Sequence, residues 1–99
     1  MDEKEFEALF RESAEHAAAQ NTDGRLCALL IRENGFCVEI EESVDGRYLR
    51  SRKIVHFHEV YAAKANLLKA AIDFAMQHHG RYRERVLQSA LADGADHAA

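Results

Sequence analysis

The residues best suited to chemistry form a cationic run directly after the turn signal Asp45-Gly46. Four cations and one aromatic ring fall within seven residues in Arg47-Tyr48-Leu49-Arg50-Ser51-Arg52-Lys53. Guanidinium and ammonium groups bind phosphates, and an aromatic ring can stack on a base. A second basic group occurs in residues 81–85. The candidate nucleic-acid-binding residues are therefore Arg47, Tyr48, Arg50, Arg52, Lys53, Arg81, Arg83 and Arg85.

The segment before this run carries the opposite charge. If Asp45-Gly46 forms a two-residue hairpin turn, Glu41 faces Arg50 and Glu39 faces Arg52. Opposite charges directly across two strands contribute roughly 0.2–1 kcal/mol each. The cationic run is then largely neutralised within its own sheet, so nucleic-acid binding becomes the alternative hypothesis. The same register places Lys53 on the apolar side, where it must extend to the sheet end unless the turn is longer.

Acidic residues form the other candidate binding surface. The formal net charge is −4, which gives no general attraction to nucleic acid or to anionic membranes. An acidic surface can imitate nucleic acid toward a protein with a basic, nucleic-acid-binding surface. The alternative interpretation is that these carboxylates only keep the chain soluble. The candidate partner-binding residues are Glu39, Glu41, Glu42 and Asp45.

The two cysteines are expected to be reduced, buried thiols. Asn34-Gly35 is a strong signal for a hairpin turn, and a turn there places Cys37 opposite Arg32. Cys27 is then roughly 16 Å away along the strand, beyond the reach of a disulfide. This cysteine usage is typical of a reducing compartment, and we expect a cytoplasmic protein.

Histidines give no clear catalytic or metal site. Cys37 and His56 lie one diagonal step apart in the expected sheet, but no third residue orients them. His56 and His58 with Glu59 leave open a weak or interfacial metal site, whereas residues 78–79 are too distant along a helix to join them. We therefore expect no catalytic residue, no metal site, no cofactor and no enzymatic activity.

Hydrophobic periodicity predicts the elements that position these residues. Helices are expected over 2–19, 58–79 and 81–92, with Gly80 ending the second. Strands are expected over 25–32, 36–44 and 47–56. The predicted fold class is α+β in the order α-β-β-β-α-α. A three-stranded antiparallel meander packs against a long helix, and the N-terminal helix covers the second apolar face of the first strand.

Length and composition fit one soluble domain. The 99 residues are 47% hydrophobic and 30% charged, with no apolar run long enough to span a membrane. The acidic start of the chain differs from a signal peptide. We expect residues 1–99 to form one domain with a frayed tail over 93–99.

The order of elements resembles that of the double-stranded RNA-binding domain. That family has a Lys-Lys-x-Ala-Lys cluster at the start of its last helix, where this chain has residues 56–64 with one lysine and an acid. No functional residue is therefore carried over from that family. In size, acidity and lack of motifs the chain is similar to compact inhibitors carried by phages and mobile elements, such as anti-CRISPR proteins, without sharing a motif with them.

The favoured function is that of a non-enzymatic protein-interaction or inhibitor module. Its expected partner is another protein, and nucleic acid is less favoured. A sheet of three strands exposes an edge strand, which invites a partner strand or a second copy. A homodimer through an edge strand or the long helix is therefore also expected as an alternative.

Overall fold

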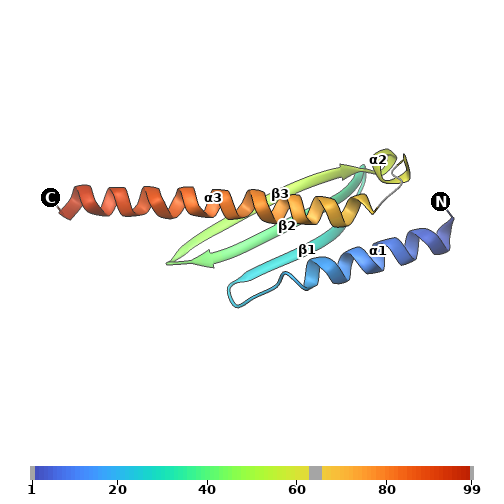
Figure 1. Ribbon diagram of the computed structural model, residues 1–99, viewed down its shortest axis with the longest axis horizontal. Helices are drawn as coiled ribbons and strands as arrows, with labels where there is room; N and C mark the ends of the chain where they lie inside the picture. Colours follow the sequence, from blue (N-terminus) through green and yellow to red (C-terminus); the bar gives the residue numbers. More distant parts are fainter. Residues whose placement is uncertain (1, 63–65, 99) are drawn as a thin grey trace.

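The computed structural model describes residues 2–62 and 66–98, with residues 92–98 described by their backbone alone. The chain forms an elongated α+β structure of 62 × 23 × 22 Å, because its last helix extends past the end of the sheet (Figure 1). The element order is α-β-β-β-α-α, with an antiparallel meander packed against a long helix. These observations confirm the predicted fold class.

Helix α1 spans Glu3–Ala18, close to the predicted range. Asp2 caps its start, since the backbone N–H of Glu5 donates to Asp2 Oδ1 at 2.8 Å. The side of α1 that packs against the rest of the molecule repeats at three- and four-residue steps. It consists of Phe6, Leu9, Phe10, Ser13 and Ala17.

Three strands, β1 (Arg25–Arg32), β2 (Gly35–Val44) and β3 (Arg47–His56), form one antiparallel sheet in the order β1-β2-β3. Asp45 and Gly46 make the second turn, with φ values of 51° and 74°. A type I′ turn requires positive φ at both central residues. Glu41 therefore pairs with Arg50, and Glu39 with Arg52. The predicted register of the second hairpin is confirmed.

The turn of the first hairpin lies one residue earlier than predicted. Arg32 pairs with Gly35, so residues 33–34 make the turn and Gly35 belongs to β2. A Cβ atom on Gly35 would lie 2.2 Å from the carbonyl oxygen of Val55. The prediction was wrong because it assigned Gly35 to a turn, whereas glycine is required there for the close approach of β3.

This change of register moves Cys37 opposite Leu30 instead of Arg32. Because the register changes by an even number of residues, each side chain keeps its face of the sheet. Cys27 belongs to the core beneath the helices, and Cys37 lies on the other face. Both cysteines are buried and free, as predicted.

Helices α1 and α3 (Leu67–Ala98) both cover the same face of the sheet (Figure 1). The expectation that α1 covers the second face of β1 is therefore wrong. Polar contacts hold the helices side by side: Lys69 Nζ lies 2.8 Å from Glu12 Oε1, and His16 Nε2 lies 2.7 Å from Asp73 Oδ1. We call the uncovered side of the sheet the open face.

The core lies between the two helices and the covered face. It gains stability mainly from removing apolar area from water. Phe36 is its centre, with aromatic contacts to α1 and to Phe57. The largest fully buried apolar side chains are Phe36, Val38, Ile40, Val60, Leu68 and Ile72.

The boundaries of the two helices after the sheet differ from the predicted ones. Helix α2 is short, Phe57–Ala62, and α3 begins at Leu67, where Asn66 Oδ1 accepts the backbone N–H of Lys69 at 3.2 Å. The predicted helix over 58–79 includes residues 63–65, which lie outside the described residues. An asparagine N-cap favours a new helix start, which explains why the long helix begins later than predicted.

Helix α3 also continues through Gly80, where the sequence predicted a stop. Gly80 has no positive φ, and a Cβ atom there would meet nothing within 4 Å. The predicted helices over 58–79 and 81–92 are thus wrongly divided. The backbone of α3 remains helical to Ala98, and the expected fraying of residues 93–99 stays a prediction.

Candidate functional site

Opposite charges form a ladder on the open face. Glu39 Oε1 lies 3.1 Å from both Arg50 Nη2 and Arg52 Nε, and Arg50 Nε lies 3.8 Å from Glu41 Oε1. The two arginines remain about half exposed, whereas the Glu39 side chain is only 14% exposed. One carboxylate therefore partly neutralises two cations that stay accessible to solvent.

The four acidic candidate residues do not form one surface. Glu39 and Glu41 belong to the ladder on the open face. Glu42 lies on the covered face, where its carboxylate contacts α3. Asp45 is exposed in the turn at the end of the second hairpin. Three of the four carboxylates thus contact cationic or histidine side chains of the same chain.

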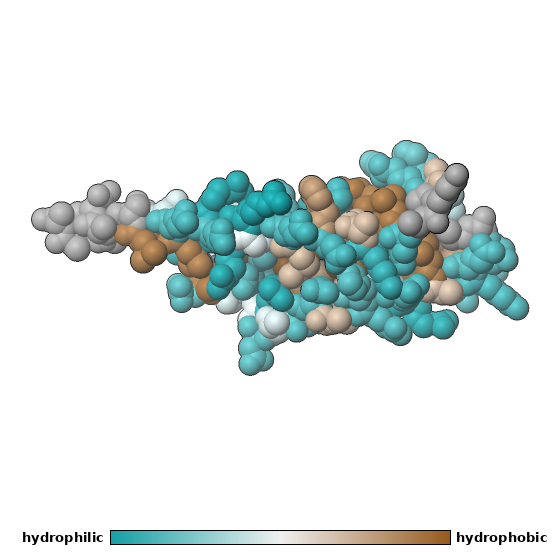
Figure 2. Space-filling view, viewed as in Figure 1, coloured by the Kyte–Doolittle hydropathy of each residue, from teal (hydrophilic) through white to brown (hydrophobic). Residues whose placement is uncertain are grey.

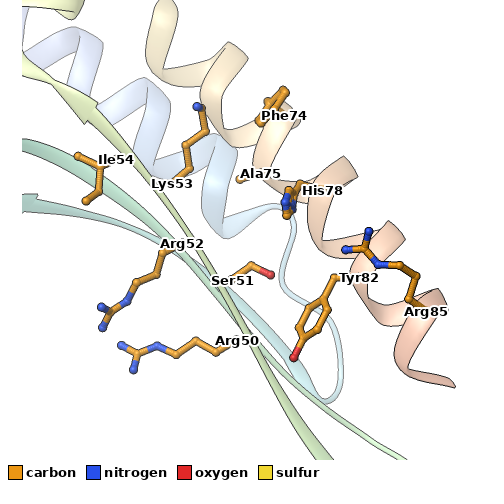
Figure 3. Close-up of a pocket in the computed structure, with 10 residues that line it drawn as sticks. All are labelled: Arg50, Ser51, Arg52, Lys53, Ile54, Phe74, Ala75, His78, Tyr82 and Arg85. Carbon is orange, nitrogen blue, oxygen red and sulfur yellow. The ribbon is translucent and has the colours of Figure 1, made fainter. Parts of the chain in front are cut away.

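A groove of about 560 Å³ lies between β3 and α3 (Figure 3). We call it the basic groove, because among the described residues its charged lining contains only arginine and lysine side chains. In Figure 3, Lys53 points toward Phe74, while Arg50, Arg52 and Ile54 extend from β3 away from the helix. The lining residues are Arg50, Ser51, Arg52, Lys53, Ile54, Phe74, Ala75, His78, Tyr82 and Arg85.

The basic groove brings together part of both basic segments identified in the sequence. Lys53 Nζ lies 4.7 Å from the centroid of the Phe74 ring, which is a cation–π contact. The ammonium group is therefore accommodated at the sheet edge, and the hairpin turn does not have to be longer than two residues. Arg85 enters the groove from α3. The groove therefore unites cations from β3 with one from a helical segment about thirty residues further along the chain.

The other predicted basic residues lie elsewhere. Arg83 points to the covered face, where its Nε atom lies 3.3 Å from Glu42 Oε2. Arg47 and Arg81 are exposed and do not line the groove. Tyr48 is 61% exposed, and hydrogen bonding to Glu41 raises the pKa of its hydroxyl.

Tyr82, His78 and Phe74 line the groove without having been predicted as site residues. Their spacing of four residues places them on one side of α3. Phe74 is 56% exposed despite its size. An aromatic residue on the exposed side of α3 was the available signal, but hydrophobic periodicity alone does not show which apolar residues of a helix stay exposed.

A buried polar network connects β2, β3 and α3. His79 Nε2 lies 2.9 Å from Glu42 Oε1, and His79 Nδ1 lies 2.7 Å from Ser51 Oγ. This order of carboxylate, imidazole and hydroxyl resembles a relay for nucleophilic catalysis. However, the His79 side chain is 2% exposed, and the backbone of Ser51 is paired with Ile40 inside the sheet. We assign the network to holding α3 on the sheet.

The predicted Cys–His pair borders a hollow of about 440 Å³ on the open face. Cys37 and His56 both line it, together with Ile54. Burial, followed by the nearby Glu39 carboxylate, raises the pKa of the Cys37 thiol. A thiol with a raised pKa is a poor nucleophile near neutral pH. The geometry therefore gives little support to cysteine chemistry at this position.

The described part of the chain contains no group of three potential metal ligands. His56 ends β3 while His58 belongs to α2, and their rings stack with centroids 5.7 Å apart. Among the side chains that the structure describes, in residues 2–62 and 66–91, no three histidine, cysteine, aspartate or glutamate residues converge as metal ligands. Nor does any helix in these ranges combine the length and apolar character that a membrane span requires.

Comparison with known proteins identified no relative of this chain: no protein-family model, no curated protein and no solved structure matches it.

Proposed function

We propose that the chain is a non-enzymatic protein-binding module that holds an extended acidic segment of another protein along β3. The observation that carries this proposal is the basic groove, whose charged lining is cationic throughout its described residues and which runs beside an edge of β3 that pairs with no other described strand. If the segment belongs to a working surface of its parent protein, binding it would also inhibit that protein.

The backbone of β3 offers hydrogen bonds along this edge. In a hairpin with a two-residue turn, the odd-numbered residues of β3 bond to β2, so the even-numbered ones point outward. At the end of the strand, the backbone N–H of His56 donates to Glu59 Oε2 at 2.8 Å. The outward groups of Tyr48, Arg50, Arg52 and Ile54 remain for an added strand, as in β-strand addition.

The side chains beside this edge favour an acidic segment with alternating apolar residues. Side chains of an added strand would alternate between the α3 side and the open face. On the α3 side they would meet Phe74 and Tyr82, and on the other side Arg50 and Arg52. This partner has the opposite charge to the one predicted from the acidic residues, because Glu39 and Glu42 already contact cations of the chain itself.

The test is a titration of the isotopically labelled full chain with a ten-residue peptide of alternating glutamate and valine. We expect the largest amide chemical-shift changes along β3. Substituting Arg85→Glu should weaken binding at least about fivefold, because it reverses a charge in the groove. Arg81→Glu is the matched control, since Arg81 is exposed on the same helix and does not line the groove.

Two further peptides separate strand addition from simple attraction of charges. N-methylation of alternate backbone nitrogens should abolish binding if main-chain hydrogen bonds carry it, although the peptide charge is unchanged. A lysine–valine peptide should not bind. Failure of the acidic peptide to shift any β3 amide at millimolar concentration would refute the proposal.

Nucleic-acid binding is the second candidate. The observation in its favour is that Lys53 on β3 and Arg85 on α3 line one groove from separate elements. Binding to a short DNA duplex that falls steeply with salt and is lost in Arg85→Glu would favour this function over the first. Absence of duplex binding at low salt, with retained peptide binding, would exclude it.

A further inference from the structure

The outer edge of β1 is the second edge of the sheet that pairs with no strand in the described part of the chain, and its residues differ in charge from those of the β3 edge. Ser43 N donates to Gly24 O at 2.8 Å, so even-numbered residues of this strand bond to β2 and odd-numbered ones point outward. Figure 1 shows β1 at one side of the sheet with α1 beside it. Any chain that extends the sheet here must bond to these odd-numbered residues.

The connection from α1 closes the first part of this edge. Thr22 and Arg25 exchange backbone hydrogen bonds of 3.0 and 3.1 Å, and Cys27 N donates to Asn21 Oδ1 at 2.6 Å. Beyond these bonds, the outward N–H and C=O groups of Leu29 and Ile31 face no other described strand. The edge therefore leaves a short stretch of backbone open rather than its whole length.

Apolar side chains surround this open stretch. Ile31 is 51% exposed on the helix side, and Leu26 is 60% exposed on the open face. A hollow of about 640 Å³ separates Ile31 from the apolar side of α1, which contributes Phe6, Phe10 and Ala14. Figure 2 shows hydrophilic side chains over much of the face in view, with smaller apolar patches between them.

The charges along the β1 and β3 edges indicate which of the two can pair with a second copy of the chain. A second copy paired along β3 would bring Arg50, Arg52 and Lys53 against the same cations, which is unfavourable. The open stretch of β1 has no charge between Arg25 and Arg32. In addition, Glu7, Arg11 and Glu15 line the α1 hollow at four-residue spacing. An antiparallel second α1 centred between Glu7 and Arg11 would place Arg11 of each copy beside Glu7 of the other.

We propose that the chain forms a two-fold symmetric homodimer in which two β1 strands pair antiparallel about Leu30. In this register Leu29 of each copy exchanges backbone hydrogen bonds with Ile31 of the other, which uses all four open groups of each strand. Leu30 then faces Leu30 of the second copy on the open face, and Arg32 faces Ala28. The two sheets become one continuous sheet with both β3 edges still free.

The experiment measures the mass of the full chain in solution by light scattering and sedimentation. We expect twice the chain mass of 11.2 kDa at micromolar concentration. Ile31→Lys should give the monomer mass, because it places a charge in the pairing interface. Ile54→Lys is the matched control: Ile54 is 62% exposed on β3 and lies outside the proposed interface.

A cysteine crosslink tests the register without depending on the folding of Ile31→Lys. Directly opposed residues of a non-hydrogen-bonded pair have Cα atoms about 4.5 Å apart, within disulfide range. Leu30→Cys, made in a Cys37→Ala background because Cys37 faces position 30 on β2, should therefore form a disulfide-linked dimer on mild oxidation. Leu26→Cys should not, because Leu26 of the two copies would be roughly 26 Å apart along the strands.

A monomeric wild-type chain, or crosslinking at Leu26 instead of Leu30, would overturn the dimer. Loss of the dimer in Ile54→Lys would equally overturn it, because that result would place the interface on β3. Peptide binding along β3 is measured separately, so failure of the dimer and failure of the proposed function give different results.

Discussion

His79 Nε2 on α3 lies 2.9 Å from Glu42 Oε1 on β2, inside the interface between the long helix and the sheet. The opposite ring nitrogen contacts Ser51 Oγ on β3 at 2.7 Å. One imidazole thus connects two strands to the helix, at a position where its side chain is 2% exposed. Buried polar groups of this kind stabilise a structure only while every member keeps its partner.

Replacing His79 should therefore cost considerable stability. His79→Leu keeps an apolar side chain of similar size but leaves Glu42 and Ser51 without the imidazole. We expect the free energy of unfolding to fall by about 2–3 kcal/mol, because a buried carboxylate loses a hydrogen bond. Urea denaturation followed by circular dichroism measures this change. His78→Ala, at the exposed neighbouring position, should change stability by less than about 0.5 kcal/mol.

Two glycine substitutions should have opposite effects. Gly35→Ala should destabilise the chain by several kcal/mol or prevent folding, because its Cβ atom would lie 2.2 Å from the Val55 carbonyl oxygen. Gly80→Ala should raise the free energy of unfolding by about 1 kcal/mol, since alanine favours a helix interior. Thermal unfolding of both variants measures the changes. A destabilised Gly80→Ala variant would show that α3 does not continue through this position.

Both thiols should react slowly in the native protein. Burial raises the pKa of Cys27 and of Cys37 above the usual value of a cysteine thiol, so less thiolate is present at pH 8 than in the unfolded chain. Alkylation by iodoacetamide should be at least about tenfold slower in the native state than in urea. Equal rates in the two conditions would show that the thiols are accessible.

The same thiols make stability depend on alkaline pH. Because their folded pKa values are raised, the unfolded chain loses these protons first as the pH rises. The free energy of unfolding should therefore be unaffected by them below about pH 8 and fall as the pH passes 9. A variant with Cys27→Ala and Cys37→Ala should lose this part of the pH dependence.

Removing the shared carboxylate of the ladder should increase the positive field of the basic groove. In Glu39→Gln, Arg50 and Arg52 lose a partner that lies 3.1 Å from each. We expect a stability loss of roughly 0.5–1 kcal/mol, as is usual for partly exposed ion pairs. The glutamate–valine peptide should bind about twofold to fivefold more tightly, because two cations are released for the ligand. Glu33→Gln, an exposed turn residue with the same change of charge, serves as the control.

Local signals predicted the second hairpin correctly. Asp45-Gly46 has the positive φ values that its turn requires, and this fixed the pairing of Glu39 and Glu41 with Arg52 and Arg50. The first hairpin failed because Gly35 serves a contact with Val55, twenty residues further along. A glycine required by a distant strand cannot be distinguished, in one sequence, from a glycine required by a turn.

The candidate site was predictable only in part. Arg50, Arg52 and Lys53 were identified, but the groove also depends on where α3 begins and on its continuation through Gly80. Those two features decide that His78, Tyr82 and Arg85 lie beside β3. The contacts of His79 with Glu42 and Ser51 span 37 and 28 residues, so no local pattern indicates them.

The side-by-side packing of α1 and α3 has a consequence for the order of folding. Its contacts, such as Lys69 with Glu12 and His16 with Asp73, join residues 57 apart in sequence. The hairpins, in contrast, close through two-residue turns and incur little loop-closure entropy. The meander should therefore form in the transition state, and the helix pair should close after it. Substitutions in α1 would then speed unfolding more than they slow folding.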